Sequence, residues 1–304
     1  MDQKKIMYSL PDFYNYFQLN MMFHQLMKQR VGLFRENAVI DSMYGTFPGL
    51  IWNSGRGQMG ASDLENIVGT INSLNEAGIS VRLTATNGKL TPEQYTDTYG
   101  NAVLNALNQI GPQHGIMNGV NVAIDSFRDY IMEKYPNLYT IWSTTKGIKT
   151  VEQVNELSKD TLTVVPYEIN NTTAVDMLTH PSMVEFLCCE SCIDNCPDRQ
   201  AHYADISQHQ AYRASSGFRC PHGCEVYFYY DNVPKRKHYI SPETIEAMYL
   251  PRGIVNFKIS GRNDHIVNVI ERYVNYFAKP EYRDEVRNLL LINAMSGPPQ
   301  MQQQ

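Results

Sequence analysis

The chain has 304 residues, of which 43% are hydrophobic, and a formal net charge of −5. This length suits one large domain or two small ones, and the weak negative charge excludes the basic surface of a general nucleic-acid or membrane-surface binder. No apolar run approaches the roughly 20 residues of a membrane span. The N-terminus lacks the apolar core of a signal peptide, so we expect a cytoplasmic protein without membrane segments.

Short β-branched and aromatic runs alternate with longer segments of helical pattern along the chain. The runs that predict strands are Val39–Met43, Ser80–Thr86, Val120–Ile124, Tyr139–Ser143, Leu162–Pro166, Val184–Cys188 and Ile254–Ile259. The segments that predict helices are Ala61–Ala77, Pro92–Ile110, Phe127–Lys134, Val151–Ser158, Ala174–Thr179, Pro242–Met248 and Asp264–Phe277. This alternation is typical of βαβ units and a parallel sheet.

The expected fold is a single α/β barrel of the TIM type over residues 1–295, followed by a disordered polar tail at 296–304. A closed barrel needs an eighth strand, which either residues 1–10 or Glu225–Tyr230 would supply. Without it the barrel would be incomplete or distorted. An open doubly wound sheet is the alternative, but no glycine-rich phosphate loop follows any predicted strand.

All six cysteines lie between Cys188 and Cys224. Five of them fall in an insertion, residues 189–239, that interrupts the alternation of strands and helices after a late strand. In a large chain without a secretion signal, such clustering favours metal ligands over disulfides. Cys188 ends the strand and is expected to point into the core or barrel, whereas Cys189 faces the other way. Simple burial as apolar residues is the alternative for most of the six.

Two C-x3-C pairs predict the metal site: Cys192 with Cys196, and Cys220 with Cys224. Their four thiolates satisfy either a four-iron four-sulfur cluster or zinc. The three-residue spacing and the adjacent prolines favour the cluster over zinc. Replacement of one ligand by Cys188 or Cys189 is left open.

In a parallel barrel the loops after the strands form the active site, because all the carboxyl ends lie at one face. Polar residues stand at nearly every predicted strand end, although loops are polar in most proteins. From these ends and the loop Thr46–Gly60 we expect substrate-binding residues at Arg56, Asn87, Lys146 and Arg262, and catalytic residues at Glu168, Glu190 and Lys258. The basic side chains suit a carboxylate or phosphate substrate, and a glutamate suits proton transfer.

The stretch VEFLCCESCIDNCPDRQAHY, beginning at Val184, resembles the segment after a late barrel strand in the collagenase-like peptidase superfamily. This superfamily includes oxygen-independent ubiquinone-biosynthesis hydroxylases and RNA-hydroxylation proteins. The segments YGTFPGLIWNSGR, GISVRLTATN and YTIWSTTKGI agree with it, and GIVNFKISGR resembles its Phe-Lys-Ile-x-Gly-Arg block, here Phe257, Lys258, Ile259, Gly261 and Arg262. The similarity covers roughly residues 38–290 and is greatest to a poorly characterised bacterial branch.

The resemblance implies a TIM barrel with a four-cysteine iron–sulfur site and a role in hydroxylation or peptide hydrolysis. Because cysteine spacing varies in the superfamily, the resemblance assigns only Cys192 and Cys196 as metal ligands. Known hydroxylases of the superfamily often work as heteromeric pairs. We therefore expect an oxygen-independent hydroxylase-like or related redox enzyme acting on an anionic small-molecule or RNA-borne substrate. The alternatives are a peptidase-like or non-catalytic barrel with structural zinc, and an RNA-modifying subunit whose partner supplies the basic surface.

Overall fold

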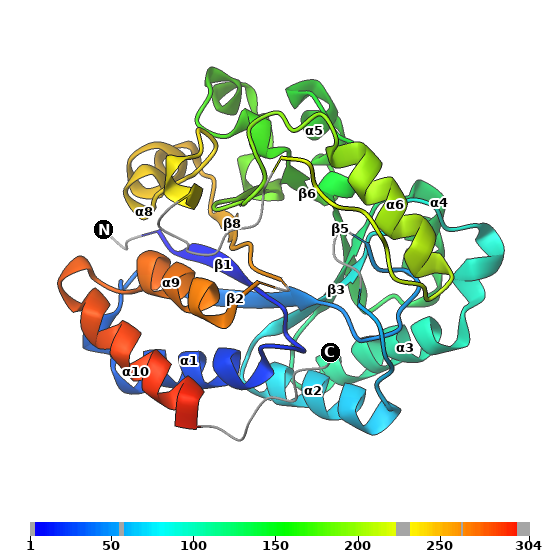
Figure 1. The fold of residues 1–304 in the computed structure, drawn as a ribbon, viewed down its shortest axis with the longest axis horizontal. Helices are drawn as coiled ribbons and strands as arrows, with labels where there is room; N and C mark the ends of the chain where they lie inside the picture. Colours follow the sequence, from blue (N-terminus) through cyan, green and yellow to red (C-terminus); the bar gives the residue numbers. More distant parts are fainter. Residues whose placement is uncertain (1–3, 55–57, 223–231, 263, 297–304) are drawn as a thin grey trace.

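Eight parallel strands form the centre of the computed structural model, which describes residues 4–54, 58–222, 232–262 and 264–296. The strands are β1 (Ile6–Pro11), β2 (Ala38–Gly45), β3 (Ser80–Ala85), β4 (Asn118–Val122), β5 (Leu138–Trp142), β6 (Leu162–Val165), β7 (Val184–Leu187) and β8 (Asn256–Lys258). They close into a barrel in chain order, with helices arranged around them (Figure 1). The prediction of a TIM-type α/β barrel is confirmed.

Closure comes from β1, which pairs with β2 on one side and with β8 on the other. On the β8 side, Tyr8 is in register with Phe257. The first of the two predicted sources of an eighth strand is therefore correct, and the second, Glu225–Tyr230, lies outside the described residues. The barrel is complete, so the open doubly wound alternative is wrong.

Helices occupy most of the segments between strands. They are α1 (Phe17–Gln29), α2 (Leu64–Glu76), α3 (Thr98–Gln113), α4 (Asp125–Lys134), α5 (Val151–Leu157), α6 (Arg199–Ala211), α8 (Pro242–Thr244), α9 (Ile266–Phe277) and α10 (Arg283–Ser296). Helices α1, α6 and α10 were not predicted. The helix predicted over Ala174–Thr179 is a 3-10 turn, Thr173–Met177, and the one predicted over Pro242–Met248 is a single α turn followed by a π-helix, Ile245–Tyr249.

Side-chain caps explain where several helices begin. The Asp63 carboxylate accepts from the Asn66 N–H at 2.7 Å, so α2 starts three residues later than predicted. The Asp97 carboxylate caps α3 in the same way, by accepting from the Gly100 N–H at 2.8 Å. Each cap satisfies a backbone N–H that has no partner within the helix.

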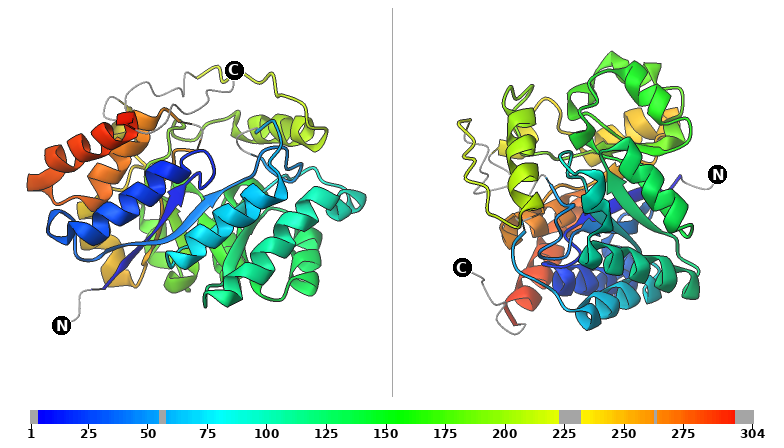
Figure 2. Two further views of the ribbon diagram at one scale, coloured as in Figure 1. Left: turned by 90° about the horizontal axis from the view of Figure 1, so that it is seen from below. Right: turned by 90° about the vertical axis from the view of Figure 1, so that its right-hand side faces the viewer.

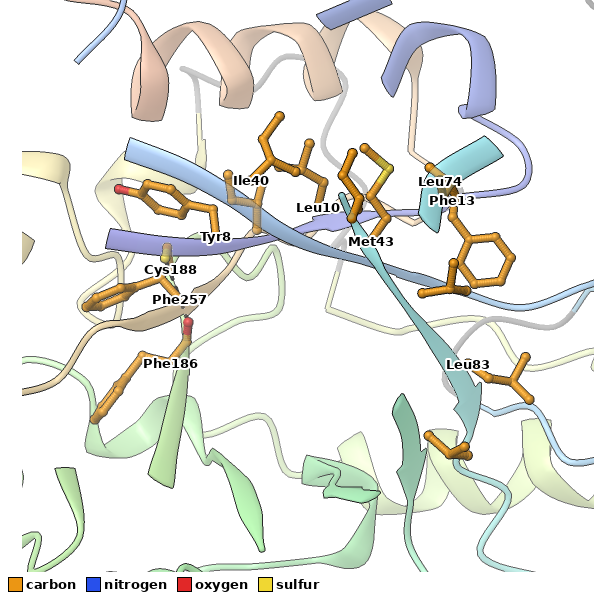
Figure 3. Packing of buried hydrophobic residues seen from close by; sticks show 14 of the residues in the cluster. Tyr8, Leu10, Phe13, Ile40, Met43, Leu74, Leu83, Phe186, Cys188 and Phe257 are labelled. Atoms are coloured by element: carbon orange, nitrogen blue, oxygen red, sulfur yellow. Dashed lines mark hydrogen bonds between the residues drawn. The ribbon is translucent and has the colours of Figure 1, made fainter. Parts of the chain in front are cut away.

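The main hydrophobic core lies between the strands and the surrounding helices. Tyr8, Cys188 and Phe257 lie together on this outer side of the barrel (Figure 3). The Tyr8 ring packs against Phe277 of α9, with ring centres 4.8 Å apart. A second, small apolar cluster of Ile141, Val164 and Leu187 joins β5, β6 and β7 separately.

Helix α6 belongs to the cysteine-rich segment and lies at the end of the barrel where the strands terminate (Figure 2). Gln210 of α6 donates to the carbonyl groups of Leu50 at 3.0 Å and Gln58 at 3.2 Å. The segment thus packs on the loop after β2 and covers part of the barrel mouth. The predicted tail lies outside the described residues except for Ser296, the last residue of α10.

Candidate active site at the mouth of the barrel

The inside of the barrel holds a network of charged side chains. Arg82 on β3 forms an ion pair with Glu185 on β7, and since these strands are not neighbours, the contact crosses the interior. Arg82 also pairs with Asp41 at 2.8 Å and donates to the Tyr139 hydroxyl at 2.7 Å. Burial opposes the charged form, but Tyr139, Glu185 and Asp41 together raise the pKa of Arg82 above its ordinary value. Such barrels usually have interiors of branched aliphatic side chains, so this polar centre is a distinctive feature of the chain.

Lys258, the last residue of β8, lies at the carboxyl end of this interior. Its Nζ atom is 3.8 Å from the centre of the Tyr44 ring and, among the described residues, makes no hydrogen bond or ion pair. Burial lowers the pKa of Lys258 from 10.5 to about 8, with Glu185 opposing the shift and Arg82 adding to it. An amine with a pKa near neutrality suits a catalytic base or nucleophile.

Arg262 and Asn87, both predicted to bind substrate, form hydrogen bonds with the segments that cover the barrel mouth. Arg262 donates to the Ser54 carbonyl at 2.6 Å. Asn87 donates to the carbonyl groups of Ile51 and Ser207, each at 2.8 Å. Both side chains are buried, so they hold the loop after β2 and helix α6 in place.

Glu168, predicted to transfer protons, is held by Arg199 at the start of α6. The Arg199 guanidinium is 2.9 Å from Glu168 Oε1 and lies over the Tyr167 ring, 4.3 Å from its centre. Burial raises the pKa of the Tyr167 phenol above its ordinary value, and a hydrogen bond with Cys192 adds to this. Within the part of the chain that the structure describes, Glu168 Oε2 is buried and makes no hydrogen bond.

Glu190 begins the cysteine loop, residues 190–196, which carries the first C-x3-C pair. Its Oε1 accepts from the N–H groups of Ser191 at 2.8 Å and Cys192 at 3.3 Å. His238 holds the same loop, with Nε2 at 3.1 Å from the Glu190 carbonyl oxygen and Nδ1 at 2.7 Å from Asp194 Oδ1. The Glu190 carboxylate, which was predicted to be catalytic, therefore forms hydrogen bonds with the backbone of its own loop.

Three of the four predicted metal ligands, Cys192, Cys196 and Cys220, are partly exposed and form no disulfide. The fourth, Cys224, lies outside the described residues. Within the ranges that the structure describes, no group of three or more His, Cys, Asp or Glu side chains could hold a metal ion. The soft thiol donors suit iron or zinc, but these residues alone do not complete a site.

The two remaining cysteines are buried side by side. Cys188 points into the core between strands and helices, as predicted (Figure 3). Cys189 faces the other way, with Sγ 3.9 Å from Ser260 Oγ. Burial raises the pKa of both thiols, and this disfavours the thiolate that a metal needs. Both are therefore weaker candidate ligands than the cysteines of the loop.

Lys146 and Arg56 do not join the residues above. Lys146 Nζ lies 2.7 Å from the Asp125 carboxylate and 4.0 Å from the centre of the Trp142 ring. These contacts hold Lys146 between the end of β5 and the start of α4, and no described contact links it to Lys258. Arg56 lies outside the described residues.

Two residues that were not predicted shape the mouth beside β6. Asn170 donates through Nδ2 to the carbonyl groups of Leu187 and His238, each at 2.8 Å. The Asn-Asn sequence, separated by three residues from the end of the predicted strand Leu162–Pro166, was a usable signal for Asn170, because strand ends carry the site in this fold. His238 had no local signal, since its partners Glu190 and Asp194 lie more than 40 residues earlier in the chain.

No family model and no curated protein matches the sequence. Among solved structures, the U32 peptidase Mk0906 is similar at 13% sequence identity, with a TM-score of 0.47 and coverage of 86% of this chain and 95% of that chain. In the described residues, no helix is both long and apolar enough to cross a bilayer. The superfamily suggested by the motifs stays a prediction.

Proposed function

We propose that this protein is an enzyme that acts on a small anionic substrate at the barrel mouth, with Lys258 as its central residue. The observation that carries the proposal is the state of the Lys258 amine, which contacts the Tyr44 ring, makes no hydrogen bond or ion pair with any described residue, and has a pKa lowered to about 8. A lysine that serves only stability is normally exposed or paired with a carboxylate. Lys258 is only partly exposed and has no carboxylate partner among the residues that the structure describes.

Lys258 has two chemical roles available near neutral pH. Its ammonium form donates hydrogen bonds to an anionic oxygen, and its neutral form accepts a proton or attacks a carbonyl carbon. Arg262 lies close enough to lower the Lys258 pKa further and adds a second positive charge. This pair of basic groups supports a carboxylate or phosphate as the group that the substrate carries.

Trace labelling with acetic anhydride over a pH series, read by peptide mass spectrometry, tests the state of Lys258 without a known substrate. We expect half-maximal relative reactivity of Lys258 near pH 8, with the exposed Lys235 labelled in the same series as the comparison. Ordinary titration of Lys258 would remove the observation on which the proposal depends. With a substrate in hand, Lys258→Arg should retain binding of the anion and lose proton transfer.

We further propose that the cysteine-rich segment binds an iron–sulfur cluster through Cys192, Cys196, Cys220 and Cys224. The support is chemical: the first pair lies on a loop that His238 and Glu190 hold at the mouth, and both thiols are partly exposed. When bound, such a cluster supplies electron transfer or a Lewis-acidic iron. The chain's residues would hold it beside the mouth, on the side of Glu168 and Tyr167.

Anaerobic purification with iron, sulfide and zinc analysis tests the cluster. A brown protein with a broad absorption band near roughly 400 nm and about four irons supports it, whereas a colourless protein with one zinc supports the structural-zinc alternative. Cys192→Ser and Cys196→Ser should abolish iron binding, and Cys188→Ala is the matched control because Cys188 lies in the core. Unchanged iron content in both serine variants would show that the ligand set is wrong.

The reaction that fits a cluster beside an anion-binding mouth is oxygen-independent hydroxylation or a related redox modification. A peptidase-like activity has weaker support, because the sequence offers no nucleophile–base motif for hydrolysis. An RNA-borne substrate or a partner subunit is tested by purifying the protein from its native cells. Co-purifying RNA or a second barrel subunit would favour the RNA-modifying alternative over a small-molecule enzyme.

A further inference from the structure

Lys258 and Glu185 lie on neighbouring strands, and both side chains point into the barrel. The Lys258 amine contacts the Tyr44 ring on β2, and the Glu185 carboxylate pairs with a side chain on β3. Neither contact joins adjacent strands, so both cross the interior. In the parallel pairing of β7 and β8, Leu187 is in register with Lys258. Glu185, two residues earlier, shares the face of Leu187, so β7 places a carboxylate on the same side of the sheet as the amine.

The Glu185 carboxylate is nevertheless paired with the opposite wall of the barrel. Its Oε1 atom forms an ion pair with Nη1 of Arg82 on β3. Among the described residues, Lys258 makes no hydrogen bond or ion pair, so Glu185 is not its partner. Glu185 is 1% exposed. This buried carboxylate therefore pairs with only one of the two basic groups in the interior.

Two further side chains fix the orientation of Arg82. Its Nε atom donates to the Tyr139 hydroxyl on β5 at 2.7 Å, and its Nη2 atom pairs with Asp41 on β2 at 2.8 Å. All three nitrogens of the guanidinium therefore have a partner, each from a different strand. Because the guanidinium is planar, it cannot turn without losing at least one of these contacts. Arg82 thus holds Glu185 towards β3.

Stability alone does not account for this ion pair. Barrels of this type usually fill their interior with branched aliphatic side chains, as Ile141, Val164 and Leu187 do in another part of this barrel. A buried ion pair is often no more stabilising than apolar side chains of similar volume. The distinctive consequence of the pair between Arg82 and Glu185 lies in the charge that it leaves next to Lys258.

We propose that Arg82 is a positioning residue for Lys258, because it holds and neutralises the Glu185 carboxylate that would otherwise act as the counter-ion of the amine. The inference rests on the role of Lys258 proposed above and deepens it. A Glu185 carboxylate without Arg82 would stabilise the ammonium form of Lys258. Arg82 without Glu185 would oppose that form. Together the two charges cancel, and the amine can lose its proton near neutral pH.

The other titratable groups around Lys258 stay in place in the test of this inference. They are Tyr44, Glu190 and Arg262, which act on Lys258 directly, Asp12 and Cys189, which lie near the Tyr44 ring, and Asp41 and Tyr139, which hold Arg82. Strand β1, the other neighbour of β8, places the uncharged Ser9 in register with Lys258. Glu185 and Arg82 influence Lys258 more than the other charged groups do.

The pH dependence of Lys258 acetylation, followed by trace labelling of the full chain, tests the inference in three variants. Arg82→Met should move the half-maximal reactivity of Lys258 upwards by about 1–3 pH units, the shift that a nearby opposite charge produces. Glu185→Gln should move it downwards by about one unit. The double variant should return it close to the value of the unmodified chain, because the pair has no net charge in either protein.

Arg128→Met is the matched control, because Arg128 is a partly buried, ion-paired arginine on α4, outside the barrel. It should leave the Lys258 profile unchanged. The inference is overturned if a folded Arg82→Met protein shows no upward shift, or if Glu185→Gln shows no downward shift. A double variant that keeps the full upward shift would also overturn it, since Arg82 would then act by direct repulsion alone.

The comparison remains decisive if Arg82→Met does not fold. Cancellation of the two charges requires the double variant to match the unmodified chain and Glu185→Gln to titrate below both. These differences between variants test the inference, whereas the absolute value in the unmodified chain tests the proposed role of Lys258. The two can therefore fail separately.

Discussion

The ammonium nitrogen of Lys258 lies 3.8 Å from the centre of the Tyr44 ring, and the Tyr44 hydroxyl donates to the carbonyl of Ile259 at 2.9 Å. This hydrogen bond fixes the Tyr44 ring over Lys258, the residue directly before Ile259 in the chain. A cation on an aromatic face gains about 0.5–2 kcal/mol. This gain is smaller than the several kcal/mol that burial of an ammonium costs, and the imbalance accounts for the lowered pKa of Lys258.

Replacing Lys258 by methionine should stabilise the fold. The pKa of the amine is about 8 in the folded chain and about 10.4 when unfolded. The unfolded chain therefore binds more protons between these values, so the penalty is complete below pH 8 and disappears as the pH rises to about 10.4. At pH 7, Lys258→Met should raise the free energy of unfolding by about 1–3 kcal/mol, measured by denaturant titration.

Denaturant titrations repeated at several pH values provide an internal check on this variant. The advantage of Lys258→Met should shrink steadily from pH 8 towards pH 10, whereas the exposed control Lys235→Met should change stability by less than about 0.5 kcal/mol throughout. A destabilised Lys258→Met protein at pH 7 would mean that the amine contributes to the fold. The low pKa would then no longer identify a site that sacrifices stability for function.

The sequence predicts most of the barrel because its strands are buried on both faces and read as short apolar runs between helices. The strand β1 was harder to recognise, since IMYSLP contains a serine and a proline and follows charged residues. Helix α6 was missed because its sequence, RQAHYADISQHQA, has little apolar periodicity. Its buried residues are mostly polar, and they bond to the loop after β2.

The site was predictable where it depends on strand ends. Lys258 ends β8 and Arg262 follows it, so both lie at the mouth as the barrel topology requires. Glu190 and Asn87 also follow strand ends, but their hydrogen bonds to backbone groups could not be seen in a sequence. The contact between Asn170 and His238 spans 68 residues, and nothing local to either residue indicates the other.

Gly100 allows helix α3 to approach the loop after β2. A Cβ atom there would lie 2.5 Å from the ring of the fully buried Trp52, so Gly100→Ala should destabilise the protein by about 1–3 kcal/mol. Gly69 is exposed in α2 with nothing within 4 Å of its Cβ position, and Gly69→Ala should add about 0.5–1 kcal/mol. Denaturant titration of both variants checks the pair, and equal effects would contradict the packing.

The charged network inside the barrel should be strongly coupled. Arg82→Met leaves Glu185, 1% exposed, without its cationic partner, and should cost about 3–5 kcal/mol. The double variant with Glu185→Gln should recover a large part of this loss, because the unpaired charge is removed as well. A double-mutant cycle measures the coupling, and simple additivity of the two single variants would show that the ion pair across the barrel is unimportant.

Helix α6 should be held on the barrel by one side chain in particular. Gln210 is 1% exposed and makes three hydrogen bonds with the loop after β2: two from Nε2, and one accepted by Oε1 from the Gln58 N–H at 3.2 Å. Gln210→Ala removes all three and leaves the Gln58 N–H without this acceptor, a loss worth about 1–3 kcal/mol, whereas the Leu50 and Gln58 carbonyls still accept from the N–H groups of Asn53 and Gly49. Local opening of α6 should become at least roughly tenfold more frequent, while the strands keep their protection.

Amide hydrogen exchange read by mass spectrometry measures this opening, with peptides from α6 compared with peptides from β3 and β4. Gln208→Ala is the matched control, because Gln208 lies in the same helix and is exposed. It should leave exchange in α6 unchanged. Faster exchange of α6 in Gln208→Ala, or unchanged exchange of α6 in Gln210→Ala, would show that apolar contacts hold α6 on the barrel.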